Sequence, residues 1–228
     1  MGLREFQKEK IREYFKRISK LPEFKEEEKI RHQRTALVDF LRTSEGIDRM
    51  TQLDLGKLVS NLWAYNAWAN KDYVVEGIWN ENPNLKEYLR MLLHGKEPFE
   101  KRFDKFIKTV KHLGPASLTE ILCLYDPKRY GVWNDRSRKA LQILGFDDLP
   151  LSKYYISGKE YIRINETLKQ IAKELQTLGH ERANLITVDL FLWLVWKEGE
   201  RKETEKEIKE LKDFDHNEIR DYIKNIGE

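Results

Sequence analysis

The sequence contains little that could build a covalent or metal-held framework. Its single cysteine is Cys123, so one chain can form neither a disulfide framework nor a cysteine-ligated zinc site or iron–sulfur cluster. No phosphate-binding GxxxxGKS or GxxxxGKT loop and no GxSxG nucleophile elbow is present. The histidines show no HxxxH or HxH spacing; they are His32, His94, His112, His180 and His216. We therefore expect no metal and no cofactor.

Long apolar runs are also missing. No stretch approaches the roughly 20 apolar residues that a membrane-spanning helix needs. The first ten residues, MGLREFQKEK, are charged and have no apolar core. These absences predict a cytoplasmic protein without a secretory signal and without a membrane partner.

Strand signals are almost absent, and the apolar residues recur with a helical period. The triplet Tyr154-Tyr155-Ile156 is the one β-like segment, and no Pro/Gly-rich linker divides the chain. The apolar run at 188–196 is typical of a helix buried within a bundle. A charged C-terminal helix is expected at about 200–228, where Asp215 to Glu218 resembles a capping box that would open a last helix. The sequence thus predicts one all-α domain, a helical bundle, over residues 1–228.

The net charge is small but unevenly distributed. The chain has 42 basic and 39 acidic residues, a formal charge of +3. Between residues 101 and 142 there are ten Lys and Arg against four acidic residues, a local charge of +6. This segment is therefore a candidate polyanion-binding face. The charged fraction of 36%, rich in Lys and Glu, is typical of proteins from hot environments.

Two amphipathic helices joined by a very short turn lie in the basic segment, at about 99–145. Such a helix-hairpin-helix presents unpaired backbone amides at the start of its second helix, where the helix dipole also favours a phosphate. These contacts go to the DNA backbone and do not read sequence. The DNA-binding candidates are the turn residues Lys111, His112, Leu113, Gly114, Ala116 and Ser117, and the later basic cluster Arg136, Arg138 and Lys139.

The stretch KHLGPASLTEILCLYDPKRYGVWNDRSRKALQILG resembles the central part of the helix-hairpin-helix DNA glycosylase superfamily, the relatives of endonuclease III and adenine glycosylase. The resemblance implies a glycosylase-like all-helical fold and double-stranded DNA as partner. It places Ala116 where some members carry a catalytic Lys, Asn134 at the shared catalytic Asp, and Lys139 at a basic position.

The chain departs from the family pattern at the positions that carry chemistry. His112 stands at the first hairpin glycine, a position that tends to need a positive φ, which His tolerates better than most residues. Ala116 cannot form a Schiff base, which argues against lyase activity. Asn134 has the shape of Asp without its charge, so only Asp135 could supply a catalytic carboxylate.

Each candidate site residue also has a structural interpretation. Asn134 and Asp135 are good helix caps, and a capping role is compatible with a role in the site. Tyr130 and Trp133 either pack in the core or line a pocket for an extruded base. The aromatic group between Trp63 and Trp79 has the same two interpretations, and its helical spacing favours the core. The basic cluster is either a solvated face or a phosphate contact.

Three functions remain open at this point. The first is a DNA-binding protein similar to base-excision DNA glycosylases that recognises a damaged or modified base. If it also cleaves the base from its sugar, the catalytic group is Asp135, or Asn134 acting through hydrogen bonding. The second is a non-catalytic DNA-binding or sensor module that works with a separate nuclease or ATPase in DNA repair or genome defence. The third is a helical protein-binding scaffold.

Overall fold

The computed structural model describes residues 2–226, with side chains up to residue 208. This part of the chain is all-helical and contains no strand, which confirms the predicted fold class. The helices are α1 Glu5–Ile18, α2 Pro22–Gln33, η1 Arg34–Leu41, α3 Ser44–Arg49, α4 Gln52–Asn61, η2 Trp63–Tyr65, α5 Lys71–Asn80, α6 Leu85–His94, α7 Phe99–Thr109, α8 Pro115–Tyr125, α9 Asp135–Ile143, α10 Gly158–Thr177 and α11 Leu185–Ile226.

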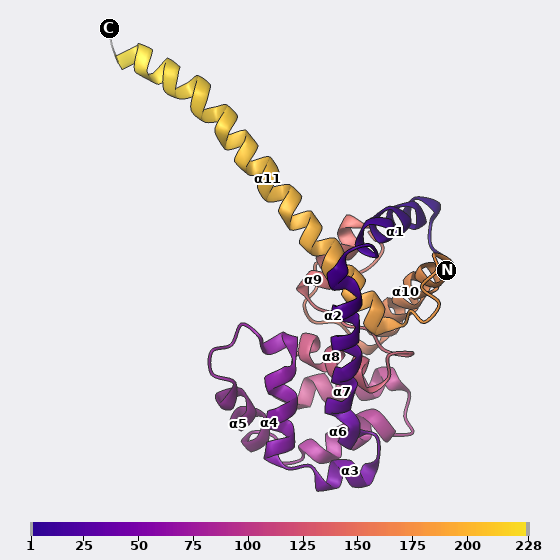
Figure 1. Ribbon diagram of the computed structural model, residues 1–228. Helices are drawn as coiled ribbons and strands as arrows, with labels where there is room; N and C mark the ends of the chain where they lie inside the picture. The colour runs from indigo at the N-terminus through magenta and orange to yellow at the C-terminus, as the bar shows by residue number, and fades with distance from the viewer. Residues whose placement is uncertain (1, 227–228) are drawn as a thin grey trace.

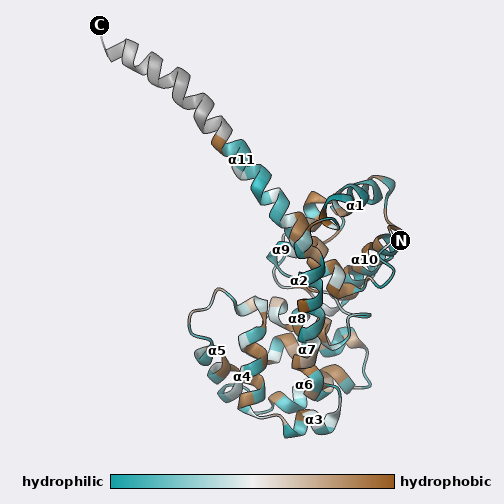
Figure 2. Cartoon of the chain, in the orientation of Figure 1, coloured by the Kyte–Doolittle hydropathy of each residue, from teal (hydrophilic) through white to brown (hydrophobic). Residues whose placement is uncertain are grey.

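The helices form two groups that meet around α8 (Figure 1). One group contains α3 to α6, and the other contains α1, α9, α10 and the first turns of α11 (Figure 1). Helix α2 and the following η1 bridge the groups, because α2 packs on α11 and η1 packs on α8. The apolar residues gather where helices face one another, and the outer faces are hydrophilic (Figure 2).

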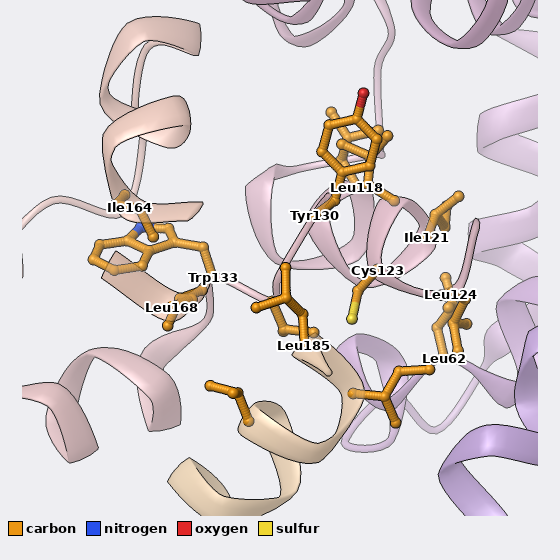
Figure 3. Packing of buried hydrophobic residues seen from close by; sticks show 14 of the residues in the cluster. Leu62, Leu118, Ile121, Cys123, Leu124, Tyr130, Trp133, Ile164, Leu168 and Leu185 are labelled. Carbon is orange, nitrogen blue, oxygen red and sulfur yellow. The ribbon is translucent and has the colours of Figure 1, made fainter. Parts of the chain in front are cut away.

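The central position of α8 follows from its sequence, PASLTEILCLY, which has no Lys or Arg. Leu118, Ile121, Leu122 and Leu124 are all buried and belong, with Cys123, to the core cluster that also contains residues of both groups. Figure 3 shows Leu118, Ile121 and Leu124 on the helix that carries Cys123. Fully burying a side chain of this kind stabilises the fold by about 1.5–3 kcal/mol. Burial also raises the pKa of the Cys123 thiol well above its ordinary value, as expected for a cysteine that packs as a small apolar residue.

Residues with local capping roles define the ends of α9 and α10. Gly145 follows α9 with φ +83°, and Gly179 follows α10 with φ +98°. Both glycines adopt the left-handed conformation that commonly ends a helix. At the other end, Ser157 and Glu160 form a capping box at the start of α10.

Helix α11 joins two segments that the sequence suggested as separate helices. Its first turns are apolar and lie among α2, α9 and α10, and the helix continues through the charged residues away from the body of the molecule (Figures 1 and 2). The helix is continuous from Leu185 to Ile226, so no new helix opens at Asp215. Of the charged helix expected at about 200–228, residues 227 and 228 lie outside the described part.

Two features are missing from the described residues. None of their helices has an apolar stretch long enough to cross a bilayer. None of their His, Cys, Asp and Glu side chains form a group of three or more that could hold a metal ion.

Candidate functional site between the α7–α8 turn and the start of α9

The turn between α7 and α8 spans Val110 to Gly114. His112 has φ +66°, the one positive φ of a residue other than glycine in the part of the chain that the structure describes. The helix-hairpin-helix pattern has its first glycine at this position. His112 adopts the left-handed conformation that was expected for that glycine. Gly114, by contrast, has φ −75° and ψ 177°, which any residue can adopt.

Side chains from the preceding helices hold the turn in place. The Asn82 side chain accepts from the Lys111 amide at 2.8 Å and donates to the Lys111 carbonyl at 3.2 Å. The Tyr65 hydroxyl donates to the His112 carbonyl at 2.7 Å. Burial raises the pKa of Tyr65 to about 12, so this hydroxyl keeps its proton. Glu81 contacts His112 Nε2 at 2.9 Å, and this contact lowers the pKa of Glu81.

The turn and the first turn of α8 border a hollow of about 580 Å³. Within the described residues, the backbone amides of Leu113, Gly114, Ala116 and Ser117 have no hydrogen-bond acceptor, as expected for the start of a helix. All four residues line the hollow. The Ser117 hydroxyl donates to the Gly114 carbonyl at 3.0 Å and tightens this start. The geometry offers amide donors and a helix dipole to an anion.

The basic residues of the 101–142 segment have different roles. Lys101, Lys105 and Lys108 are spaced i, i+4 and i+7 on the exposed side of α7 and have no acidic partner among the described side chains. Arg102 is buried and donates to the carbonyls of Glu97 and Leu92. The local charge of +6 therefore overstates the charge that a ligand meets on this face.

Asn134 is the N-cap of α9, which confirms the capping interpretation. Its Oδ1 accepts from the Ser137 amide at 2.9 Å, and the Ser137 hydroxyl accepts from the Asn134 amide at 2.9 Å. The Asn134 Nδ2 group donates to no acceptor in the described chain. This cap uses one side of the amide and leaves the other side available to a ligand.

Asp135 is exposed and surrounded by the basic cluster. Its carboxylate contacts the Arg138 guanidinium at 3.0 Å and the Lys139 ammonium at 3.3 Å. The hydrogen bond to Asp135 raises the pKa of Lys139. Arg138 is mostly buried and also donates to the Leu151 carbonyl at 3.2 Å. Arg136 is exposed and stacks on Trp196 at 4.9 Å, so it is the member of the cluster without an acidic partner in the described chain.

A second cavity, of about 270 Å³, brings together positions that the resemblance singled out. Ala116, Asn134 and Asp135 all line it. The Trp133 amide donates to Thr119 Oγ1 at 2.9 Å, so the segment before α9 is held against α8. Two helix starts, those of α8 and α9, therefore face one cavity.

Tyr130 and Trp133 do not line this cavity. Trp133 is 1% exposed and packs near Ile164 and Leu168 (Figure 3), and its buried Nε1 has no hydrogen-bond partner. Tyr130 is buried and stacks on Phe99 with ring centroids 4.7 Å apart. For both residues the structure shows core packing.

Three further residues of the cavity, Arg31, Asp189 and Trp193, were not identified from the sequence, and they lie there together with Trp63. Arg31 on α2 pairs with Asp189 on α11 at 2.6 Å, and its guanidinium lies 3.6 Å from the Trp63 ring centroid. Trp193 also lies on α11. Arg31 is buried, and its Nε has no hydrogen-bond partner. Arg31 and Asp189 are 158 positions apart in the chain, and no local motif could have identified them.

Glu120 on α8 fixes Trp63 at the edge of this cavity. Its buried carboxylate accepts from the amides of Trp63 and Ala64, each at 2.9 Å, and from Arg34. Burial raises the pKa of Glu120, while Arg34 and the two amides oppose that rise. Glu120 is therefore a structural group, although it belongs to the basic segment by sequence.

Comparison of the chain with protein-family models, with curated proteins and with solved structures gives no match.

Proposed function

We propose that this chain is a DNA-binding protein that docks the phosphate backbone on the α7–α8 turn and receives a base in the cavity at the start of α9. This is the mode of action that the resemblance to base-excision DNA glycosylases implies. The observation that carries the proposal is that Ala116, Asn134 and Asp135, which the resemblance singles out, line one cavity beside a turn with unpaired amides.

The cavity suits recognition of a planar polar ligand. Trp63 and Trp193 supply aromatic surface, and Asn134 Nδ2 and Arg31 Nε supply donors that have no acceptor in the described chain. Nucleobases are recognised in proteins by stacking together with hydrogen bonds to their edges. We therefore favour a protein that reads a damaged or modified base over one that only holds the DNA backbone.

Excision of that base is the second candidate function, because two carboxylates line the cavity, although each of them is paired with a cation. Asp135 and Asp189 both line the cavity, and a carboxylate near the sugar could stabilise the cation that develops as the base departs. In that reaction water replaces the base at the sugar carbon, and no cofactor takes part. A reader without this activity would act with a separate nuclease or ATPase.

The salt dependence of binding to duplex DNA tests the docking proposal. Each phosphate neutralised by a Lys or Arg contributes about −0.9 to the slope of log K against log salt. Contact with roughly four to six phosphates predicts a slope of about −4 to −5. Affinity that stays flat between low and moderate salt would instead favour the protein-binding scaffold.

Two lysine variants locate the contact. Lys108→Gln should make the negative slope shallower by about 1, because it removes one phosphate contact. Lys16→Gln on α1 removes another exposed lysine without an acidic partner in the described chain, far from the turn in sequence, and should leave the slope unchanged. Equal effects of the two variants would show that the attraction is not centred on α7.

A further inference from the structure

The most exposed aromatic side chains of the described residues gather at one place. Trp68, Tyr73, Tyr154 and Tyr155 are 53%, 63%, 48% and 67% exposed, and all four line the hollow beside the α7–α8 turn. Single exposed aromatic residues are common, but a group of them at a hollow marks a binding site. The helical spacing of the Trp63 to Trp79 group predicted core positions, and for Trp68 and Tyr73 that prediction is wrong.

Two segments far apart in the sequence build this aromatic wall. Trp68 lies in the connection between η2 and α5, and Tyr73 lies in the first turn of α5. Tyr154 and Tyr155 lie in the connection between α9 and α10 and meet edge to face, with ring centroids 4.9 Å apart. Trp68 in turn packs edge to face on the buried Tyr65 at 6.4 Å. The rings are therefore supported by the fold and also open to solvent.

Cations and amide donors lie on the same hollow. Lys108, Lys111 and His112 line it, and Lys108 has no acidic partner among the described side chains. Glu81 is the one acidic residue of its lining and is held by Lys111 and His112. Tyr154 lines both this hollow and the cavity at the start of α9, so the two sites adjoin.

We propose that the hollow binds the unstacked bases of single-stranded DNA, with phosphates on Lys108 and the turn amides and bases on the aromatic rings. Every base has a flat face, so stacking on Trp and Tyr tolerates any sequence. In a duplex those faces are covered by neighbouring bases. This proposal rests on the proposed DNA-binding function and adds to it a single-strand mode of binding, in which Lys108 and the turn amides that dock a duplex hold the phosphates and the aromatic rings hold the bases.

Fluorescence anisotropy of labelled oligonucleotides tests the stacking. The probes are an oligothymidylate of roughly 12 nucleotides, within the range of known single-strand site sizes, an abasic oligomer with the same backbone and no bases, and a duplex. The wild type should bind the oligothymidylate about 10-fold or more tightly than the abasic oligomer, as loss of base stacking implies. Tryptophan fluorescence should be quenched on binding, because Trp68 is exposed at the site.

Variants separate the hollow from the rest of the surface. Trp68→Ala and Tyr155→Ala should each weaken binding of the oligothymidylate about 10-fold and leave binding of the duplex unchanged. Trp68→Phe keeps a ring and should restore most of the affinity. Phe6→Ala removes an exposed aromatic of α1 that does not line the hollow and should have no effect.

The outcomes distinguish this proposal from the proposed function. Equal affinity for the oligothymidylate and the abasic oligomer, or no effect of Trp68→Ala, overturns the stacking site even if duplex binding is normal. Thymidine monophosphate that binds as tightly as the oligomer also overturns it, because the ligand would then be a free nucleotide. Single-strand binding that depends on Trp68, without duplex binding, supports the site and refutes duplex docking. Binding of no DNA refutes both.

Discussion

Replacing Gly114 by valine separates DNA docking from folding more cleanly than any other change in the turn. Gly114 has φ −75° and ψ 177°, so a side chain there causes no backbone strain. A Cβ at this position would meet the Tyr154 hydroxyl at 2.9 Å and otherwise only atoms of the same ring. Tyr154 is half exposed, so its ring can move aside. Valine is a poorer N-cap than glycine, which costs about 1 kcal/mol of folding stability.

The expected loss of DNA affinity is larger than this loss of stability. A branched side chain at Gly114 keeps a phosphate away from the amides at the start of α8. Hydrogen bonds to a charged group contribute about 1.5–3 kcal/mol, so loss of one weakens binding about 10- to 150-fold. Thermal unfolding measures the loss of folding stability, and anisotropy with a labelled duplex measures the loss of DNA affinity.

A matched glycine variant gives the opposite pattern. A Cβ at Gly158 would lie 2.2 Å from the Glu100 carbonyl oxygen, a backbone atom that cannot move aside. Gly158→Ala should therefore lower the thermal stability strongly, and the fraction that remains folded should bind DNA normally. A folded Gly114→Val protein that binds duplex DNA like the wild type would refute the assignment of this turn as the DNA contact. If Gly114→Val does not fold, the smaller Gly114→Ala variant repeats the test.

Two further predictions concern charge. If the wild type releases a base in a lesion panel, Asp135→Asn should reduce that release about 100-fold without weakening DNA binding. An active wild type that tolerates Asp135→Asn contradicts the catalytic role. Asn134→Asp restores the family pattern and should raise base release, or create it if the wild type has none. Glu160 has its pKa lowered to about 2 by Lys153 and by the Ser157 amide, so its contribution to stability is complete above the ordinary pKa of Glu and is lost as pH falls toward 2. Glu160→Gln should therefore lower the free energy of unfolding at neutral pH by about 1 kcal/mol, a value kept small because solvent screens the charge. The unfolding curves of the wild type and the variant should converge in acid. A difference in stability that persists in acid would refute the role of the Glu160 charge.

The helices of the central segment could be predicted because their signals are local. The apolar stripe of α7 and the glycine after α9 need no information from the rest of the chain. The positive φ of His112 agrees with what the resemblance implies for this position, where the family pattern has a glycine. Asn134 acts as the N-cap that its residue type suggested.

The roles of charged residues could not be predicted in the same way. Arg102 and Arg138 count toward the basic segment, yet both are largely enclosed and donate to backbone carbonyls. Glu120 lowers the net charge calculated for the basic segment, yet its carboxylate is buried and bound to Arg34. A sum of charges treats each side chain as solvated, whereas its partner is set by packing between distant parts of the chain.

Aromatic residues show the limit of periodicity as a signal. The spacing from Trp63 to Trp79 is helical, but the chain leaves the helical conformation between η2 and α5. Trp68 lies in that connection and therefore does not share a buried helix face with its neighbours. Trp133 shows the opposite case, since its place beside the predicted site suggested a pocket, and the fold buries it in the core.

The charge balance at the α9 cavity favours reading a base over removing it. Electrostatic catalysis of base release needs a negative charge whose field reaches the developing sugar cation uncompensated. Asp135 is exposed to water and paired with Arg138 and Lys139, and Asp189 is paired with Arg31. Each carboxylate at the cavity thus has its own cation, and Asn134 has no charge. Hydrogen bonding and stacking of a base do not require net charge, and the groups for both are present. The cavity therefore contains the groups that the proposed binding of a base would use and lacks the isolated carboxylate that its excision would require.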